Sequence, residues 1–267
     1  MHKALKAKGE IVMINLILSF FKFLFHGNSK KDEDKSLWNS TLGEFIATFS
    51  VLEKAGLTLK MLKQLREKDG YKIAKKIVAL FIVSDYEIKV NWYMFYKKYF
   101  DIDIDLSNVK IPVPKLGFTR CIIIIPSITP NMVVAKMKEL FTVWTYTDDL
   151  DKAVTKNDRE AKDKPYAIWV KDGLETEKDY RNMSSETIAK KNILGETLLE
   201  RLIHGFEYYD KTKKHLDYKD ITLCSGSRDS DGSVLHVCFD PSHDEVSVSW
   251  CSTDYSGDDL GVREVSF

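Results

Sequence analysis

The sequence predicts an α+β fold, because strand and helix patterns alternate through its second half. A continuous β-branched run at 121–125 is typical of a strand buried on both faces. Apolar residues at 133–141 recur with the spacing of a helix that faces a sheet. Within 220–251, apolar and polar residues alternate around Asp231-Gly232, the strongest short signal for a hairpin turn.

The elements of this region follow one another in a regular order. Thr129 caps the first helix and Pro130 opens it. Ser184 is expected to cap one long helix whose apolar stripe ends at Phe206. Further strands are expected at 143–147, 166–170 and 221–225. The order β-α-β-β-α-β is that of a ferredoxin-like split βαβ unit, which the C-terminal antiparallel hairpins would extend.

Composition divides the chain into four parts. These are a hydrophobic N-terminal helix (1–26), a charged linker (27–36), a small helical unit (37–84) and an α/β domain (85–267). Weak alternation at 86–92 predicts that the α/β domain begins with a strand. The apolar stretch at 11–25 covers about 22 Å as a helix, which is short of the ~30 Å hydrocarbon core.

Three alternatives remain for this apolar stretch. It is a helix lying in a membrane interface, a helix docked on this protein or on a partner, or a signal peptide or full span. The first alternative predicts a cytoplasmic protein held peripherally at the inner face of the membrane. Lys8-Gly9-Glu10 can be encoded by a ribosome-binding sequence at a suitable distance before Met13. We therefore hypothesise that translation starts at Met13 and that 1–12 is untranslated.

The net charge of zero hides an asymmetry along the chain. Residues 1–100 hold 18 basic and 10 acidic side chains, whereas 220–267 hold 2 basic and 10 acidic ones. The acidic C-terminal part is therefore not expected to bind the phosphates of a nucleic acid. Lysines of the helical unit leave a nucleic-acid-binding helix-turn-helix as an alternative. Four cysteines without a CxxC pair argue against a zinc ribbon and fit a reducing compartment.

A candidate ligand site lies in the first C-terminal turn. Ser225 and Ser227 supply hydroxyls, and Arg228 is one of only two arginines in the acidic part of the chain. An anion or a partner's carboxylate is the ligand that an arginine favours. Trp144 and Tyr146 share one face of an expected strand and are added to this site. The alternative for Arg228 is an ion pair with a nearby aspartate of the same chain.

A second candidate site gathers carboxylates at the start of a polar loop, 148–164. Asp148, Asp149 and Asp151 follow an expected strand, and Asp172 is the one residue elsewhere that we add to them. Carboxylate oxygens are the ligands of magnesium and calcium. The alternative is a turn and helix-cap cluster whose carboxylates bond to backbone N–H groups. A divalent metal is the only cofactor that the sequence suggests.

The first hairpin also predicts the surroundings of two cysteines. If Asp231 is the centre of the turn, Cys224 lies opposite Cys238; a two-residue Asp231-Gly232 loop would instead set Cys224 opposite Phe239. Directly opposed residues have Cβ atoms about 4.5–5.5 Å apart, which is longer than the ~3.8 Å of a disulfide. We therefore expect reduced thiols in either register.

Several motifs of the α/β region resemble an uncharacterised family of bacterial hypothetical proteins. They are Trp144–Asp151, Tyr166–Asp172, Leu198–Leu202, Lys214–Asp217 and Ile221–Gly232. The resemblance spans Gly117–Trp250 and carries no established activity. From the residues alone we expect a non-catalytic module that binds a protein or a small molecule. The alternatives are a metal-dependent enzyme using the aspartate cluster and a nucleic-acid-binding accessory factor using the helical unit.

Overall fold

The computed structural model describes residues 50, 58, 63–64, 67, 85–115 and 117–267. The chain divides into two compact units, Met1–Ile82 and Val83–Phe267, and the helices and strands described below belong to the second. The apolar N-terminal stretch, the linker and most of the helical unit lie outside the described residues. The predictions about the membrane, the start at Met13 and nucleic acid fall on that part of the chain and stay predictions.

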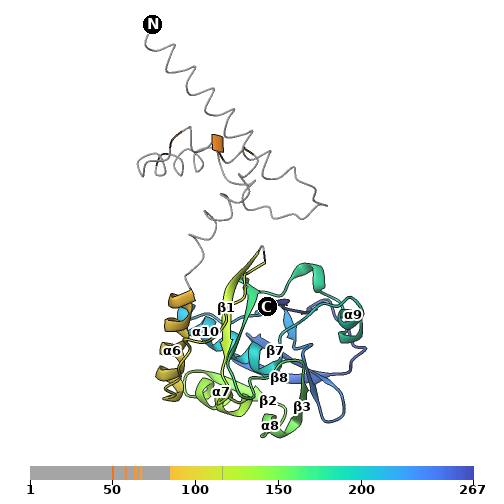
Figure 1. Cartoon of the computed structure of the whole chain (residues 1–267). Coiled ribbons are helices and arrows are strands. Elements are labelled where there is room, and N and C mark those ends of the chain that lie inside the picture. The colour runs from red at the N-terminus through yellow and green to blue at the C-terminus, as the bar shows by residue number, and fades with distance from the viewer. Residues whose placement is uncertain (1–49, 51–57, 59–62, 65–66, 68–84, 116) are drawn as a thin grey trace. The chain divides into compact units, whose positions relative to one another are not determined.

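The second unit is a mixed α+β structure, as the sequence predicted (Figure 1). A three-stranded antiparallel sheet has the order β1 (Phe118–Ile124), β4 (Tyr166–Lys171), β10 (Val265–Ser266). A five-stranded mixed sheet has the order β2 (Thr142–Thr145), β8 (Glu245–Cys251), β7 (Val234–Asp240), β5 (Ile221–Leu223), β9 (Leu260–Gly261). A two-stranded ribbon pairs β3 (Val154–Asn157) with β6 (Ser227–Asp229). The helices are α6 (Asp85–Phe100), α7 (Pro130–Lys138), α8 (Leu150–Ala153), η1 (Lys178–Tyr180), α9 (Ser185–Lys190) and α10 (Leu198–Thr212).

The predicted ferredoxin-like order is wrong for this structure. Its four strands are divided between two sheets, because β1 pairs antiparallel with β4 while β2 pairs parallel with β8. Strands β1 and β4 are largely buried and pair with each other, with β4 at the centre of the three-stranded sheet and β1 at its edge. Strand β2 buries only Val143 and takes the edge of the other sheet.

The first element of the described unit is a helix, not the strand expected at 86–92. The buried residues Ile88, Trp92 and Phe95 recur at helical spacing, and this periodicity outweighs the weak alternation. Trp92 Nε1 donates to the carbonyl of Cys121 at 3.0 Å. Tyr96 donates in the same way to Ile123 of β1 at 2.6 Å. Helix α6 therefore covers the outer edge of β1, which would otherwise expose unpaired backbone groups.

The structure differs from two further predictions, because the sequence analysis overlooked a local helix cap in each case. The long helix expected after Ser184 is divided into α9 and α10, since Thr197 and Glu200 form a reciprocal capping box that starts a new helix. The loop expected at 148–164 contains α8 and β3. The first helix agrees with its prediction: Thr129 accepts a bond from the backbone of Met132 and Pro130 opens α7.

The C-terminal hairpins form, but one register differs from both predictions. Strands β7 and β8 pair around the expected turn, and Gly232 has the positive φ of 89° that its turn was expected to need. However, Cys224 N donates to Leu235 O, so Cys224 faces neither Cys238 nor Phe239. The chain turns outward after Cys224 to pair β6 with β3, and this excursion shifts the register. All four cysteines are free.

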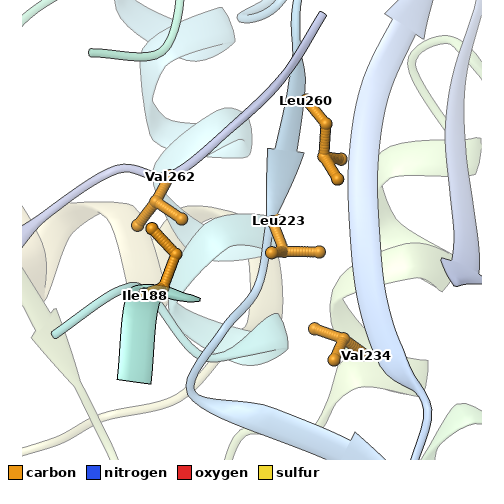
Figure 2. Packing of buried hydrophobic residues seen from close by; sticks show 5 residues of the cluster. All are labelled: Ile188, Leu223, Val234, Leu260 and Val262. Atoms are coloured by element: carbon orange, nitrogen blue, oxygen red, sulfur yellow. The ribbon is translucent and has the colours of Figure 1, made fainter. Parts of the chain in front are cut away.

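Two apolar clusters hold these layers together. Helix α10 contacts α7, β1 and β7, and its buried Leu202 and Phe206 belong to the main core. The second cluster lies where α9 and the C-terminal segment pack on β5 and β7 (Figure 2). It consists of Ile188, Leu223, Val234, Leu260 and Val262. Among the described residues, no helix has the length and hydropathy needed to cross a membrane.

Candidate anion-binding site

The loop that carries Arg228 is fixed against the start of α10. Gly226 N donates to Glu196 O at 3.1 Å, and a Cβ at Gly226 would lie 3.2 Å from that same oxygen. Ser227 accepts a bond from Leu198 N at 2.8 Å and donates to Asn157 at 2.6 Å. Because Ser227 is fully buried, its hydroxyl positions the loop and does not face a ligand.

Arg228 lies at the surface end of this loop. Its Nη1 donates to the carbonyls of Ser225 and Ser227 at 2.8 and 2.7 Å, and its Nη2 donates to Ser185 Oγ at 2.7 Å. Ser225 is buried, so its part in the site is this backbone carbonyl. Since a guanidinium has five N–H donors, two remain without a partner among the described residues. The three bonds hold the guanidinium in one orientation.

Arg228 also differs from the other arginines of the described residues in its charge environment. Each of the others forms an ion pair with a carboxylate: Arg120, Arg159, Arg181, Arg201 and Arg263. No described carboxylate forms one with Arg228, so the alternative of an intramolecular ion pair is wrong. Its partial burial lowers the pKa of Arg228, and the charge of Asp158 opposes this from a longer distance. A half-buried cation without a carboxylate in ion-pair contact among the described residues favours an anionic ligand.

A second cation lies directly across the ribbon from Arg228. Lys156 of β3 is the register partner of Arg228 in β6. Like charges at directly opposed positions destabilise a strand pair. Lys156 also lines an open depression of about 350 Å³. The other lining residues are Thr155, Asn157, Asp158, Glu160 and Lys162. The hollow thus carries two lysines and two carboxylates, and Arg228 is not among the residues that line it.

Among the described residues, no hydrogen bond or cation–π contact joins Arg228 to the predicted aromatic residues Trp144 and Tyr146, and their part in the site stays a prediction. Trp144 is 47% exposed on β2, an edge strand of the five-stranded sheet. Burial, followed by the charges of Asp229 and Asp231, raises the pKa of Tyr146, which therefore lies beside the turn after β6.

The predicted metal ligands fall into two separate places. Asp149 caps α8 and accepts a bond from Asn131 Nδ2 at 2.9 Å, while Asp151 accepts one from Asn131 N at 3.0 Å. Asp148 is exposed beside them. Asp172 forms an ion pair with Arg120 at 2.8 Å. The described residues contain no group of three or more His, Cys, Asp or Glu that could hold a metal ion. The metal hypothesis stays a prediction.

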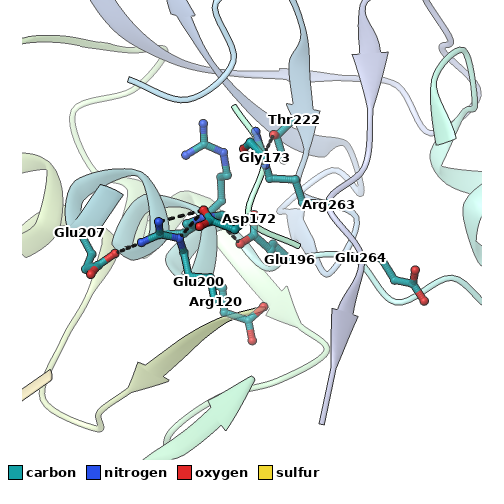
Figure 3. Close-up of polar contacts among 12 residues, drawn as sticks. Arg120, Asp172, Gly173, Glu196, Glu200, Glu207, Thr222, Arg263 and Glu264 are labelled. Carbon is teal, nitrogen blue, oxygen red and sulfur yellow. Dashed lines mark hydrogen bonds and ion pairs between the residues drawn. The ribbon is translucent and has the colours of Figure 1, made fainter. Parts of the chain in front are cut away.

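Sequence reasoning missed a buried charged network on α10. Asp217 accepts bonds from Arg201 at 2.7 Å and from Arg263 at 2.6 Å. Arg263 also donates to Thr222 Oγ1 and to the carbonyl of Gly173 (Figure 3). The signal was available, because Arg201 interrupts the apolar stripe of α10, but the sequence does not show which distant carboxylate it meets.

A second pair of side chains in this network is His204 and Glu196, in which a carboxyl group orients an imidazole. His204 Nδ1 and Glu196 Oε1 share a hydrogen bond of 2.8 Å, and both side chains are fully buried. Burial, followed by the charges of Arg263 and Arg201, holds the pKa of His204 well below its usual value. Burial raises the pKa of Glu196 to about 7 although those arginines oppose the shift. His204 Nε2 and Glu196 Oε2 have no partner among the described residues.

Orientation of a neutral imidazole by a carboxylate is the arrangement used in general-base catalysis. Catalysis also requires that a substrate reach the free ring nitrogen. His204 has no exposed surface, so this pair acts within the core. Burial likewise raises the pKa of Cys224 far above that of an ordinary thiol, which disfavours a thiolate nucleophile.

Comparisons of the chain with protein-family models, with curated proteins and with solved structures each find no match. No family model therefore supports the bacterial family suggested by the motifs between Gly117 and Trp250. The function has to be argued from the chemistry of the site.

Proposed function

We propose that this protein is a non-catalytic binding module that takes an anionic group, a carboxylate of a protein or of a small molecule, at Arg228. The observation that carries the proposal is a guanidinium held by three hydrogen bonds to neutral oxygens, with two donors left and no ion-paired carboxylate among the described residues. Carboxylates accept two parallel N–H bonds from arginine. Lys156, across the ribbon, adds a second positive charge.

Two further parts of the function expected from the sequence are contact with a membrane and a metal-dependent activity. The apolar stretch at 11–25 would hold the module at a membrane surface, at the inner face in the cytoplasm. A metal-dependent enzyme gains no support from the geometry, because Asp149 and Asp151 bond to Asn131 whereas Asp172 pairs with Arg120. Binding through Arg228 needs neither a metal nor a cofactor.

Nuclear magnetic resonance of the arginine side chains tests the proposal directly. The probe is sodium acetate, added at constant ionic strength by exchange for sodium chloride. We expect a saturable shift of the Arg228 Nε–H signal, because a carboxylate would take up its free donors. The five ion-paired arginines are internal controls and should respond weakly.

The Arg228 variants lack this Nε–H signal and are therefore followed through the backbone amides of Ser227 and Asp229. Arg228→Gln should remove the acetate response of these amides, and Arg228→Lys should keep a weaker one, because lysine retains the charge but not the paired donors. Arg181→Gln, which removes an arginine paired with Asp220, is the matched control and should leave the Arg228 response intact. A response of Arg228 no larger than that of the paired arginines would exclude the site.

A further inference from the structure

Glu196 connects the buried charged network to the loop that carries Arg228. Its side chain is fully buried within that network (Figure 3). Its backbone carbonyl accepts a bond from Gly226 N at 3.1 Å, in the middle of the loop. Arg228 in turn donates to the carbonyls on both sides of Gly226, those of Ser225 and Ser227. Two consecutive hydrogen-bonded contacts thus connect Glu196 to the guanidinium of Arg228.

The carboxyl group of Glu196 is paired at only one of its oxygens. Oε1 bonds to His204 Nδ1 at 2.8 Å, whereas the buried Oε2 has no partner among the described residues. An ionised carboxylate held in this way lacks donors for one oxygen, whereas a protonated carboxyl group has no charge to be satisfied. Burial accordingly raises the pKa of Glu196 to about 7, against the opposing charges of Arg201 and Arg263. The group therefore changes its charge near neutral pH.

The surrounding charges set the consequence of this change. Arg201 and Arg263 both pair with Asp217, which gives two positive charges and one negative charge in the core. Ionised Glu196 brings this sum to zero, whereas protonated Glu196 leaves one positive charge without a counter-charge. The titratable and charged groups around Glu196 come from α10, from the segments before and after β5, from the C-terminal segment and from the loop after β3: Arg201, His204, Glu200, Asp217, Cys224, Arg263 and Arg159.

We propose that Glu196 is a proton switch of the Arg228 site, which binds its anion more tightly when Glu196 is protonated than when it is ionised. This inference rests on the function proposed above for Arg228. The physical reason is that an ionised carboxylate close to the loop repels an anion at the guanidinium, whereas a protonated one does not. Coupling between two sites is reciprocal, so the bound anion also makes Glu196 easier to protonate.

Titration with acetate at pH 6, 7 and 8 tests the switch, because acetate stays ionised throughout this range. The backbone amides of Ser227 and Asp229 report binding at constant ionic strength. We expect the affinity to rise about threefold from pH 8 to pH 6 in the wild type, and to stay constant in Glu196→Gln, whose side chain cannot ionise. Glu177→Gln is the matched control and should keep the pH dependence. Burial also raises the pKa of Glu177 to about 7, but none of its hydrogen bonds within the described part of the chain reaches the Arg228 loop.

Carbon-13 nuclear magnetic resonance of the glutamate carboxyl groups tests the same coupling in the unaltered chain. Saturating acetate should move the titration midpoint of Glu196 upward by about half a pH unit, the shift that corresponds to a threefold coupling, and leave that of Glu177 in place. If acetate shifts no amide at any pH, both the Arg228 site and its switch are excluded. The site stands and the switch is overturned if acetate binds equally at pH 6 and pH 8, if Glu196→Gln keeps the wild-type pH dependence, or if the Glu196 midpoint does not move.

Discussion

Arg263 and Arg228 show two ways in which this chain buries a guanidinium. Arg263 is almost fully buried, and it donates to Asp217 Oδ1 as well as to a hydroxyl and two carbonyls. Arg228 is half-buried and donates only to two carbonyls and to Ser185 Oγ, all of them neutral. The two arginines therefore differ in burial and in the presence of a counter-charge.

The difference follows from the cost of removing charge from water. A buried cation without a carboxylate costs several kcal/mol, so Arg263 is stable in the core only with Asp217 beside it. Arg228 keeps part of its guanidinium in water and tolerates the absence of a partner. Arg263 consequently stabilises the fold, whereas Arg228 retains donors for a ligand.

The largest expected effect concerns Asp217, the buried carboxylate that pairs with Arg263. Asp217→Asn removes the charge that neutralises both Arg201 and Arg263, so we expect a loss of about 3–5 kcal/mol in the free energy of unfolding. Urea denaturation measures this loss. Asp172→Asn removes an exposed partner of Arg120 and should cost less than about 1 kcal/mol. Equal losses of unfolding free energy in Asp217→Asn and Asp172→Asn would show that a buried ion pair contributes no more here than an exposed one.

The second prediction concerns the pH dependence of the same core. Because burial raises the folded-state pKa of Glu196 from 4.5 to about 7, this group binds a proton more tightly in the folded chain. Its contribution to stability is full below pH 4.5 and is lost as the pH rises through 7. The difference in unfolding free energy between the wild type and Glu196→Gln should therefore grow in favour of the wild type as the pH falls from 7 to 4.5, by up to about 3 kcal/mol.

His204 contributes in the opposite direction, since its folded-state pKa is lowered and stability is lost as the pH falls below 6.5. Because His204 contacts Glu196 directly, the same comparison in a His204→Gln background separates the carboxyl group from the imidazole. Urea denaturation at pH 7.5, 6 and 5 gives the three values. A difference that does not change with pH would mean that Glu196 stays ionised, held by Arg201 and Arg263.

A smaller effect on stability is expected at the surface arginine. Arg228→Gln removes hydrogen bonds to neutral oxygens and leaves no charge unpaired, so we expect a loss of about 1 kcal/mol. Arg263→Gln, which leaves Asp217 with one arginine fewer, should cost several times more. Urea denaturation of the two variants compares them directly. Similar losses of unfolding free energy in the two variants would contradict the distinction between Arg263, which stabilises the fold, and Arg228, which retains donors for a ligand.

The smallest effect should have the opposite sign. Lys156→Gln removes the like charge opposed to Arg228, and we expect a gain of a few tenths of a kcal/mol in the free energy of unfolding. The same variant should weaken acetate binding at Arg228, because one of two adjacent positive charges is lost. Thermal unfolding and the acetate titration measure the two changes. A variant that is less stable and binds acetate normally would show that Lys156 and Arg228 do not repel each other.

Local signals predicted the parts of the fold that depend on neighbouring residues. Thr129 and Pro130 start α7, and Gly232 adopts positive φ at its turn. The β7–β8 hairpin follows from alternation around Asp240. Arg228 was selected because it is rare in an acidic segment, and the structure adds the reason that it matters, namely its missing carboxylate.

Predictions that needed distant residues were wrong or incomplete. The strand at 121–125 was recognised, but its partner β4 and the covering helix α6 depend on pairings that no local pattern encodes. Asp217 was visible only as part of a motif, because its two arginines are 16 and 46 residues away along the chain. The Cys224 register failed because an excursion toward β3 interrupts the hairpin.

The sequence by itself determined the α+β class, the caps, the turns and the polar ends of the C-terminal hairpins, because backbone preferences and hydrogen bonds act within a few residues. Only the tertiary structure decided the division into two sheets, the burial of Arg201 and Arg263 around Asp217, and the isolation of Arg228. These outcomes depend on which apolar faces meet and which charges they enclose. A charge has a fixed identity in the sequence, but its burial and its partner exist only once the chain has packed.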